Sequence, residues 1–153
     1  MSYFESILNT YQHNHCEYTV NEEAEVAFML VQTNVSQCTV VATSDEDMGL
    51  IHIFARLQEF CPTEKIHDTM RLLNKLNFLI NVGAWTLDEA DGEVRFRIIQ
   101  AHLAPPDLAQ IEQHLQLVIV GHDSFAEKLL SYFNDEVTIE DLFETIEELF
   151  STT

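Results

Sequence analysis

The sequence has few of the residues that build tight loops, disulfides and cationic surfaces. Its 153 residues include 4 glycines, 3 prolines, 3 cysteines and 7 lysines and arginines. The shortage of glycine and proline, beside an apolar share of 46%, argues against disorder and indicates a globular protein. The chain contains no GxxxxGK[ST], GxGxxG or GxSxG motif, so we expect no phosphate-binding loop and no cofactor.

Cations are scarce, whereas acids are abundant. The chain carries 26 aspartates and glutamates, which give a formal net charge of −19. Such a charge repels nucleic acid and anionic membranes and attracts basic groups. We therefore expect a protein partner or client, with a basic one favoured, and neither nucleic acid nor membrane as a partner. The alternative is that the charge only keeps a soluble protein from associating with itself.

The cysteines and the N-terminus indicate a reducing compartment. Cys16, Cys38 and Cys61 are odd in number, widely spaced and form no CxxC pair, as in proteins with free, buried thiols. Residues 1–5 lack the basic and apolar regions of a signal peptide. No stretch approaches the roughly 18–20 apolar residues of a membrane span. We expect a cytoplasmic protein.

Hydrophobic periodicity predicts an α+β fold. Ser2 and Glu5 fit a capping box that begins a helix ending near His13. The stretch 26–32 is almost wholly apolar and is interpreted as a central strand that is apolar on both faces. The order is α-β-β-β-β-α-β-β-α-α, which predicts an antiparallel sheet flanked by helices, in one domain over 1–153. The predicted elements are a helix at 2–13, strands at 16–20, 26–32, 37–43 and 48–57, a helix from 62, a hairpin at 80–99, and helices at 106–133 and from 138.

The hairpin has a predicted register. Asp91-Gly92 lies between two apolar runs, and this dipeptide supplies the positive φ angles of a two-residue type I′ turn. That turn would place apolar residues opposite each other on one face and acid opposite base on the other. The predicted pairs are Leu87 with Phe96, Trp85 with Ile98, Asp88 with Arg95 and Thr86 with Arg97.

The positions of the histidines do not indicate a catalytic or metal-binding site. His13-x-His15-Cys16 is a local cluster of metal-ligand types, but a zinc site needs three or four converging ligands and no further ones lie nearby. Cations at a helix C-terminus are also favoured by the helix dipole alone. His122 lies in the apolar stripe of the 106–133 helix, so we expect a buried, hydrogen-bonded histidine without metal. We predict no catalytic residues and no metal site; a metal-dependent enzyme using the His13 cluster is the alternative.

Surplus apolar residues predict an interaction surface. Several crowd the junction between the helix from 62 and the following strand, and others lie on the second face of the sheet. This surface could be covered by the rest of the chain, by a second copy or by a client. The candidate dimer or partner residues are Leu73, Leu76, Phe78, Leu79, Ile80, Leu50 and Phe54.

The central stretch also resembles a known family. The segment 72–77, Leu-Leu-Asn-Lys-Leu-Asn, followed by 83–94 with its acidic Asp-Gly turn, is similar to the YbjN family, described as bacterial sensory transduction regulators. The helix that opens with Asp107-Leu108 and runs through Phe125 is similar as well. The fold of that family resembles type III secretion chaperones, which are small, acidic, dimeric proteins that bind unfolded stretches of a client.

The resemblance implies a non-enzymatic protein-binding or regulatory protein of chaperone-like fold in the bacterial cytoplasm. It also implies a homodimer paired through the central helix or the strand that follows. A dedicated type III secretion chaperone is the alternative. The family offers no catalytic or ligand residues to carry over to this chain.

Overall fold

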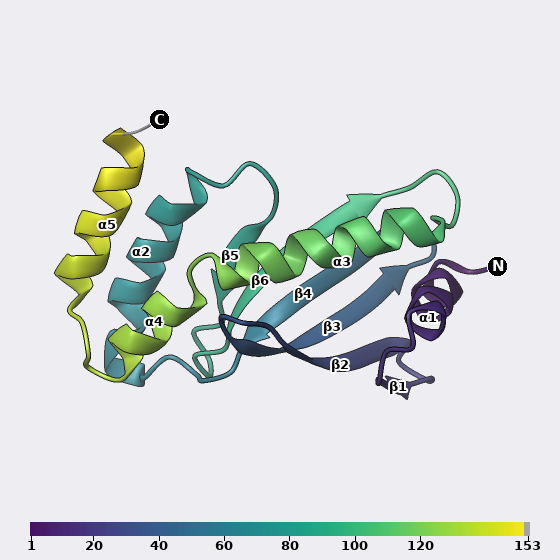
Figure 1. Ribbon diagram of the computed structural model, residues 1–153, viewed down its shortest axis with the longest axis horizontal. Helices are drawn as coiled ribbons and strands as arrows, with labels where there is room; N and C mark the ends of the chain where they lie inside the picture. The colour runs from purple at the N-terminus through teal and green to yellow at the C-terminus, as the bar shows by residue number, and fades with distance from the viewer. Residues whose placement is uncertain (152–153) are drawn as a thin grey trace.

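The computed structural model describes residues 1–151 and places one layer of helices against one sheet (Figure 1). The N-terminus and the end of α5 lie at opposite ends of an elongated molecule. Its elements are α1 (Tyr3–His13), β1 (Thr19–Asn21), β2 (Val26–Gln32), β3 (Gln37–Asp45), β4 (Leu50–Leu57), η1 (Thr63–Lys65), α2 (Ile66–Asn77), β5 (Ala84–Leu87), β6 (Val94–Ala101), α3 (Leu108–Asp123), α4 (Ala126–Phe133) and α5 (Ile139–Ser151).

The six strands form one antiparallel sheet in the order β1-β2-β3-β4-β6-β5. Helices α1 and α3 contact each other, and both contact β4, so they lie on the same side of the sheet. Helix α2 packs beside β5 and against α5 at the other end of the molecule (Figure 1). The predicted α+β class and the predicted order of strands and helices are confirmed.

The core lies between the sheet and these helices. Alternate residues of the strands point to the helices, as the period of two requires, and most of them are buried. On β4 these residues are Ile51, Ile53, Ala55 and Leu57, the face predicted from the alternation. Trp85 of β5 and Phe96 of β6 meet edge to face, with ring centroids 5.5 Å apart, and close the core at the β5 side.

Side-chain caps fix where three helices begin. Ser2 and Glu5 form the predicted capping box of α1, and Asp107 and Gln110 form one at α3. Thr138 Oγ1 accepts from the Asp141 backbone N–H as α5 begins. Each such cap stabilises a helix by about 1 kcal/mol, because it satisfies an otherwise unpaired N–H group.

The predicted helix over 106–133 is interrupted. Helix α3 ends at Asp123 and α4 begins at Ala126, turning away from the line of α3 (Figure 1). Ser124 donates its hydroxyl to the Gly121 carbonyl oxygen at 2.6 Å, which competes with continued helical hydrogen bonding. Phe125 is buried at the break, so the apolar stripe continues although the helix does not.

The predicted hairpin register is wrong by two residues. Leu87 faces Val94, and Trp85 faces Phe96. Asp88 and Glu93 close a four-residue loop instead of a two-residue turn, through a hydrogen bond of 2.9 Å from the Asp88 N–H to the Glu93 carbonyl oxygen. A shift of two keeps every side chain on its predicted face, which is why the pattern did not reveal the error.

A tertiary contact selects the longer loop. The Gly92 carbonyl oxygen accepts a hydrogen bond of 2.8 Å from the Cys61 N–H, so the loop is tied to the segment before η1. Gly92 has a φ of +86°, and a Cβ there would lie 2.4 Å from the Cys61 carbonyl oxygen. Only glycine allows both the positive φ and this close approach.

The strand predicted at 26–32 is apolar on both faces, as expected, but it is not central in the sheet. Strand β2 is the second strand from the edge, and its residues alternate between buried and exposed. Phe28 and Leu30 are 37% and 64% exposed, whereas Ala27 and Met29 are buried beneath the helices. An apolar residue on the outer face breaks no backbone pairing, so the run of apolar letters does not by itself imply two covered faces.

Candidate protein-binding surfaces

The predicted surface residues are divided between core and surface. Leu73, Leu76 and Phe54 are buried within the chain, so their side chains offer little area to a partner. Leu50 is half-buried, and so are Leu79 and Ile80. The exposed member of the predicted set is Phe78, which is 77% accessible at the end of α2.

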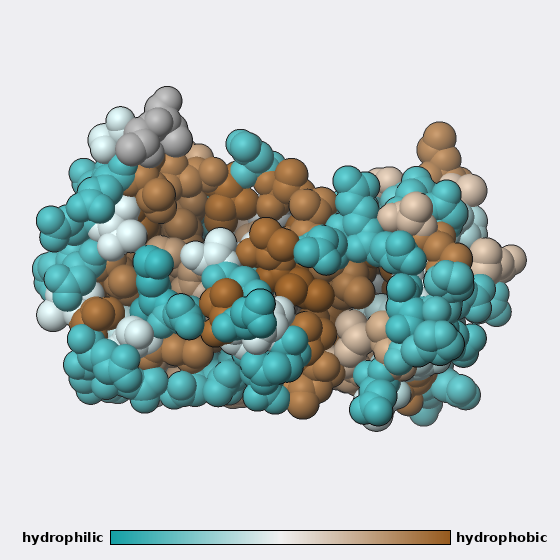
Figure 2. Space-filling model, in the orientation of Figure 1, coloured by the Kyte–Doolittle hydropathy of each residue, from teal (hydrophilic) through white to brown (hydrophobic). Residues whose placement is uncertain are grey.

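Phe78 belongs to an apolar patch on the helical side of the molecule. This junction patch comprises the exposed residues Phe78 and Val82 with half-buried Leu79 and Ile80 between them. Figure 2 shows apolar residues gathered over this region, between α2 and the C-terminal half of α3, with hydrophilic residues toward both ends of the molecule.

An asparagine fixes the junction patch to the sheet. Asn77 donates its side-chain amide to the Trp85 carbonyl oxygen at 3.0 Å and accepts from the Trp85 N–H at 2.9 Å. The amide therefore pairs with the outer edge of β5 as a neighbouring strand would. The last residue of α2 and the edge strand are held together, and the loop that carries the patch is closed between them.

The second side of the sheet, here called the open face, lies opposite α1 and α3. Its apolar members Phe28, Leu30 and Ile99 are 37%, 64% and 46% exposed. Cross-strand register makes three rows on this face: Phe28, Val41, Phe54 and Arg97; Leu30, Thr39, Arg56 and Arg95; Val26, Thr43, His52 and Ile99. The open face is therefore apolar over β2 and cationic over β4 and β6.

The cations on the open face are packed to different degrees. The Arg95 guanidinium lies 3.9 Å from the centre of the Phe54 ring and covers it, which is why Phe54 is buried without a helix above it. Arg56 and Arg95 both pair with Glu93, Arg56 at 3.5 Å. Arg97 is exposed, and within residues 1–151 no ion pair is formed by its guanidinium.

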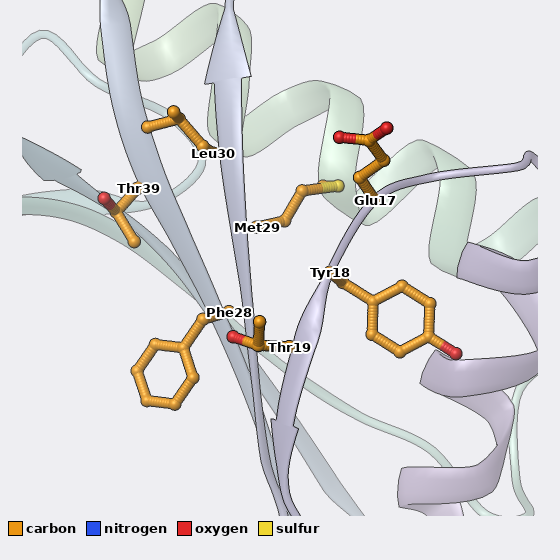
Figure 3. A pocket seen from close by; sticks show the side chains of 7 residues that line it. All are labelled: Glu17, Tyr18, Thr19, Phe28, Met29, Leu30 and Thr39. Carbon is orange, nitrogen blue, oxygen red and sulfur yellow. The ribbon is translucent and has the colours of Figure 1, made fainter.

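The open face continues into a groove at the sheet edge. Strand β1 pairs only with residues Val26 to Phe28 of β2, so the rest of β2 has no strand on that side within the described chain. A groove of about 460 Å³ lies there (Figure 3). Its lining residues are Glu17, Tyr18, Thr19, Phe28, Met29, Leu30 and Thr39. Free backbone groups beside an apolar groove are what an added strand uses.

Burial lowers the pKa of the histidines that lie in or beside the core. His122 is fully buried, as predicted, and its Nδ1 lies 3.5 Å from both Ser36 Oγ and Asp123 Oδ1. Burial lowers its pKa, against the opposing effect of Asp123. His52 is half-buried on the open face, where burial and then the charges of Arg97 and Arg95 lower its pKa.

The cluster considered for metal binding does not gather further ligands. His13 lies in the last turn of α1, and His15 follows with a φ of +55°. Over residues 1–151 no group of three or more histidine, cysteine, aspartate or glutamate side chains converges as a metal site would require. In the same residues no helix is long and apolar enough to cross a bilayer.

The fold has a counterpart among solved structures. No family model and no curated protein matches this chain. A chain in the structure of the HopA1–SchA chaperone–effector complex superposes with a TM-score of 0.59 at 12% sequence identity, over 82% of this chain and 94% of that one. The fold is secretion-chaperone-like. The likeness covers most of this chain and concerns its architecture.

The sequence did not reveal that three arginines meet on the open face. Arg56 is predicted on the same face of its strand as Leu50 and Phe54, and Arg95 and Arg97 alternate within the hairpin. What brings them together is the pairing of β4 with β6, two strands separated by α2 and β5 in the chain. The alternation of arginines at 95 and 97 was a signal that one strand carries charge on a single face.

Proposed function

We propose that this protein is a non-enzymatic, cytoplasmic protein-binding or regulatory protein that holds an extended segment of a client on the open face. The observation that carries the proposal is the exposure of Phe28, Leu30 and Ile99 on one sheet face that lies opposite the helices. Apolar residues gathered in this way, beside an unpaired strand edge, are typical of surfaces that bind other proteins.

The fold supports this proposal. One solved structure with a similar fold is a chaperone–effector complex, in which one protein is bound to another. A dedicated type III secretion chaperone is the alternative form of the same function. A sensory transduction regulator of the YbjN type, acting by protein binding, is the form that the central stretch of sequence suggests.

We propose in addition that two copies associate through the junction patch. The exposed ring of Phe78 has little cover from its own chain, and a two-fold axis would bury it against an identical patch. Association in this way would leave the open face of each copy available to a client. The net charge of −19 would favour the approach of a client whose surface is basic overall.

An array of random 12-residue peptides tests client binding. The protein should bind a subset of the peptides, because extended segments fit the groove and the sheet face beside it. Leu30→Ser should weaken binding about tenfold or more, since Leu30 lines the groove and is more exposed than Phe28 and Ile99. The matched control is Leu103→Ser, which removes a fully exposed leucine from the loop between β6 and α3.

Two results would contradict the proposed function. One is an array on which the folded protein binds no peptide. The other is equal weakening by the Leu30 and Leu103 variants, which would show nonspecific adhesion to apolar side chains.

A further inference from the structure

We propose that the segment held on the open face carries carboxylate side chains next to apolar ones, so that the contact itself is acidic although the protein is acidic overall. This inference rests on the proposed function and names the chemistry of the partner. It follows from where the few cations of the chain lie.

The distribution of charge on the open face is opposite to that of the molecule. The chain has 7 lysines and arginines against 26 acids, yet Arg56, Arg95 and Arg97 all project from this one face. Glu93 accompanies them and pairs with two of the three. Along the strands, Asp45 at the end of β3 is an acidic residue on this face, and Asp88 follows β5 and lines a pocket with Arg95 and Arg97. The cationic half of the face is therefore locally positive.

The three guanidinium groups are arranged for binding an anion. Arg56 and Arg95 are direct cross-strand neighbours, and Arg97 lies opposite Phe54 in the adjacent row. Arg95 is held by the Phe54 ring and by Glu93, so less side-chain entropy is lost when it binds. Arg97 extends beside it with its donors exposed. A planar guanidinium matches a carboxylate through two parallel hydrogen bonds, which makes a carboxylate its natural partner.

The spacing between the two halves of the face sets the spacing in the partner. Three strand-to-strand steps separate β2 from β6, and each step is about 4.8 Å, so Leu30 and Arg95 stand roughly 14 Å apart across the sheet. An extended chain advances about 3.3 Å per residue and covers that distance in about four residues. A segment crossing the face would thus carry an apolar residue and an aspartate or glutamate about four positions apart.

The overall charge does not prevent this contact. At physiological salt the Debye length is about 8 Å, so most of the acids around the molecule are screened from a carboxylate at the centre of the open face. The charged groups gathered there are Arg56, Arg95 and Arg97, with Glu93 and Asp88 as the acids beside them, and their sum is positive. The whole-chain charge still disfavours a polyanion such as RNA, whose many phosphates would extend beyond the cationic half of the face.

The peptide array also tests this inference. Peptides bound by the wild-type protein should contain at least about twice the aspartate and glutamate of the unbound peptides, and less lysine and arginine. The strongest peptide is then resynthesised with glutamine and asparagine in place of its acids and measured by fluorescence anisotropy. We expect its dissociation constant to rise about tenfold.

Charge reversals at two positions test whether the preference for acidic peptides comes from the open face. Arg97→Glu should remove the preference for acids and weaken the strongest peptide about tenfold, because it places a carboxylate where the proposal places a guanidinium. Lys128→Glu on α4 changes the net charge by the same amount away from the open face and should alter binding less than twofold. Arg97→Gln, which adds no negative charge, should fall between them. Circular dichroism and thermal unfolding of each variant establish that it is folded.

The outcomes separate this inference from the proposed function. No bound peptides would overturn the proposed function and this inference together. Bound peptides without acid enrichment, or equal weakening by Arg97→Glu and Lys128→Glu, would overturn this inference alone. Displacement of the strongest peptide by a single-stranded RNA 12-mer at equal concentration would also overturn it, because the face would then be a general site for polyanions.

Discussion

Removing the side chain of Asn77 should destabilise the protein through two hydrogen bonds that hold α2 to β5. Asn77 bonds both the N–H and the carbonyl oxygen of Trp85, at 2.9 and 3.0 Å, on the outer edge of the sheet. Each such bond contributes about 1 kcal/mol net to stability, so removing both in Asn77→Ala lowers the free energy of unfolding by about 2 kcal/mol. The higher helix propensity of alanine raises it by roughly 0.6 kcal/mol. We expect a net loss of about 1–2 kcal/mol in the free energy of unfolding.

Asn74→Ala is the matched control for this prediction. Asn74 lies one turn earlier on α2 and is exposed. Its replacement should leave stability unchanged or raise it by about 0.5 kcal/mol, from helix propensity alone. Urea unfolding followed by circular dichroism measures both variants, and a common m-value makes the midpoints comparable. If Asn77→Ala were as stable as Asn74→Ala, the two bonds to Trp85 would contribute nothing, and some other contact would have to hold β5 against α2.

Four further outcomes are expected. His122→Leu should retain the fold and change the free energy of unfolding at pH 7 by less than about 1.5 kcal/mol, measured by urea titration; loss of the fold or of a bound metal would contradict the reading of His122 as a core residue. Burial lowers the pKa values of His52, His114 and His122, so the unfolded state binds more protons than the folded state. The free energy of unfolding should therefore fall as the pH drops below the ordinary histidine pKa of about 6.5. A free energy of unfolding that stays constant between pH 7 and 5 would refute this. Sedimentation equilibrium should show a dimer whose affinity rises between about 0.01 M and 0.15 M salt, because screening weakens the repulsion between acidic chains. Phe78→Ser should lower that affinity. A monomer at high micromolar protein in the higher salt would contradict the dimer proposal. Gly92→Ala should lower the free energy of unfolding by about 1–3 kcal/mol, measured by thermal unfolding, because the added Cβ would lie 2.4 Å from a backbone oxygen in a positive-φ conformation. An unchanged melting temperature would show that the loop accommodates the Cβ without strain.

The local signals in the sequence predicted local structure well. The capping box of Ser2 and Glu5 gave the beginning of α1, and the alternation of Ile51, Ile53 and Ala55 gave the buried face of β4. Both depend on residues within one element, where side-chain chemistry and backbone period act directly. The class of fold followed from the order of such elements, because grouped strands can pair only as an antiparallel sheet without crossovers.

Tertiary contacts decided what the local signals could not. Asp91-Gly92 marked the turn correctly, but the hydrogen bond between Cys61 and Gly92 selects a four-residue loop over the two-residue turn. The competing loop conformations differ by little, so a single contact with a distant segment is enough to choose between them. The break after Asp123 has no proline to announce it either, and it coincides with the local bond between Ser124 and Gly121.

The open face shows why a binding surface is harder to predict than a core. Leu30 and Arg95 are 65 positions apart in the numbering, and they become members of one row only through β3 and β4 between them. A core residue must be apolar wherever its strand lies in the sheet, so the sequence of that strand alone is enough to predict which of its residues are buried. The charge of a surface is instead a sum over neighbouring strands, and it depends on their order. Had β4 paired with β5 instead of β6, Phe54 would lack the cover of Arg95, and the same sequence would present an apolar face with its cations at one edge. The strand order thus determines whether the net charge of −19 or the local arginines govern what the open face can hold.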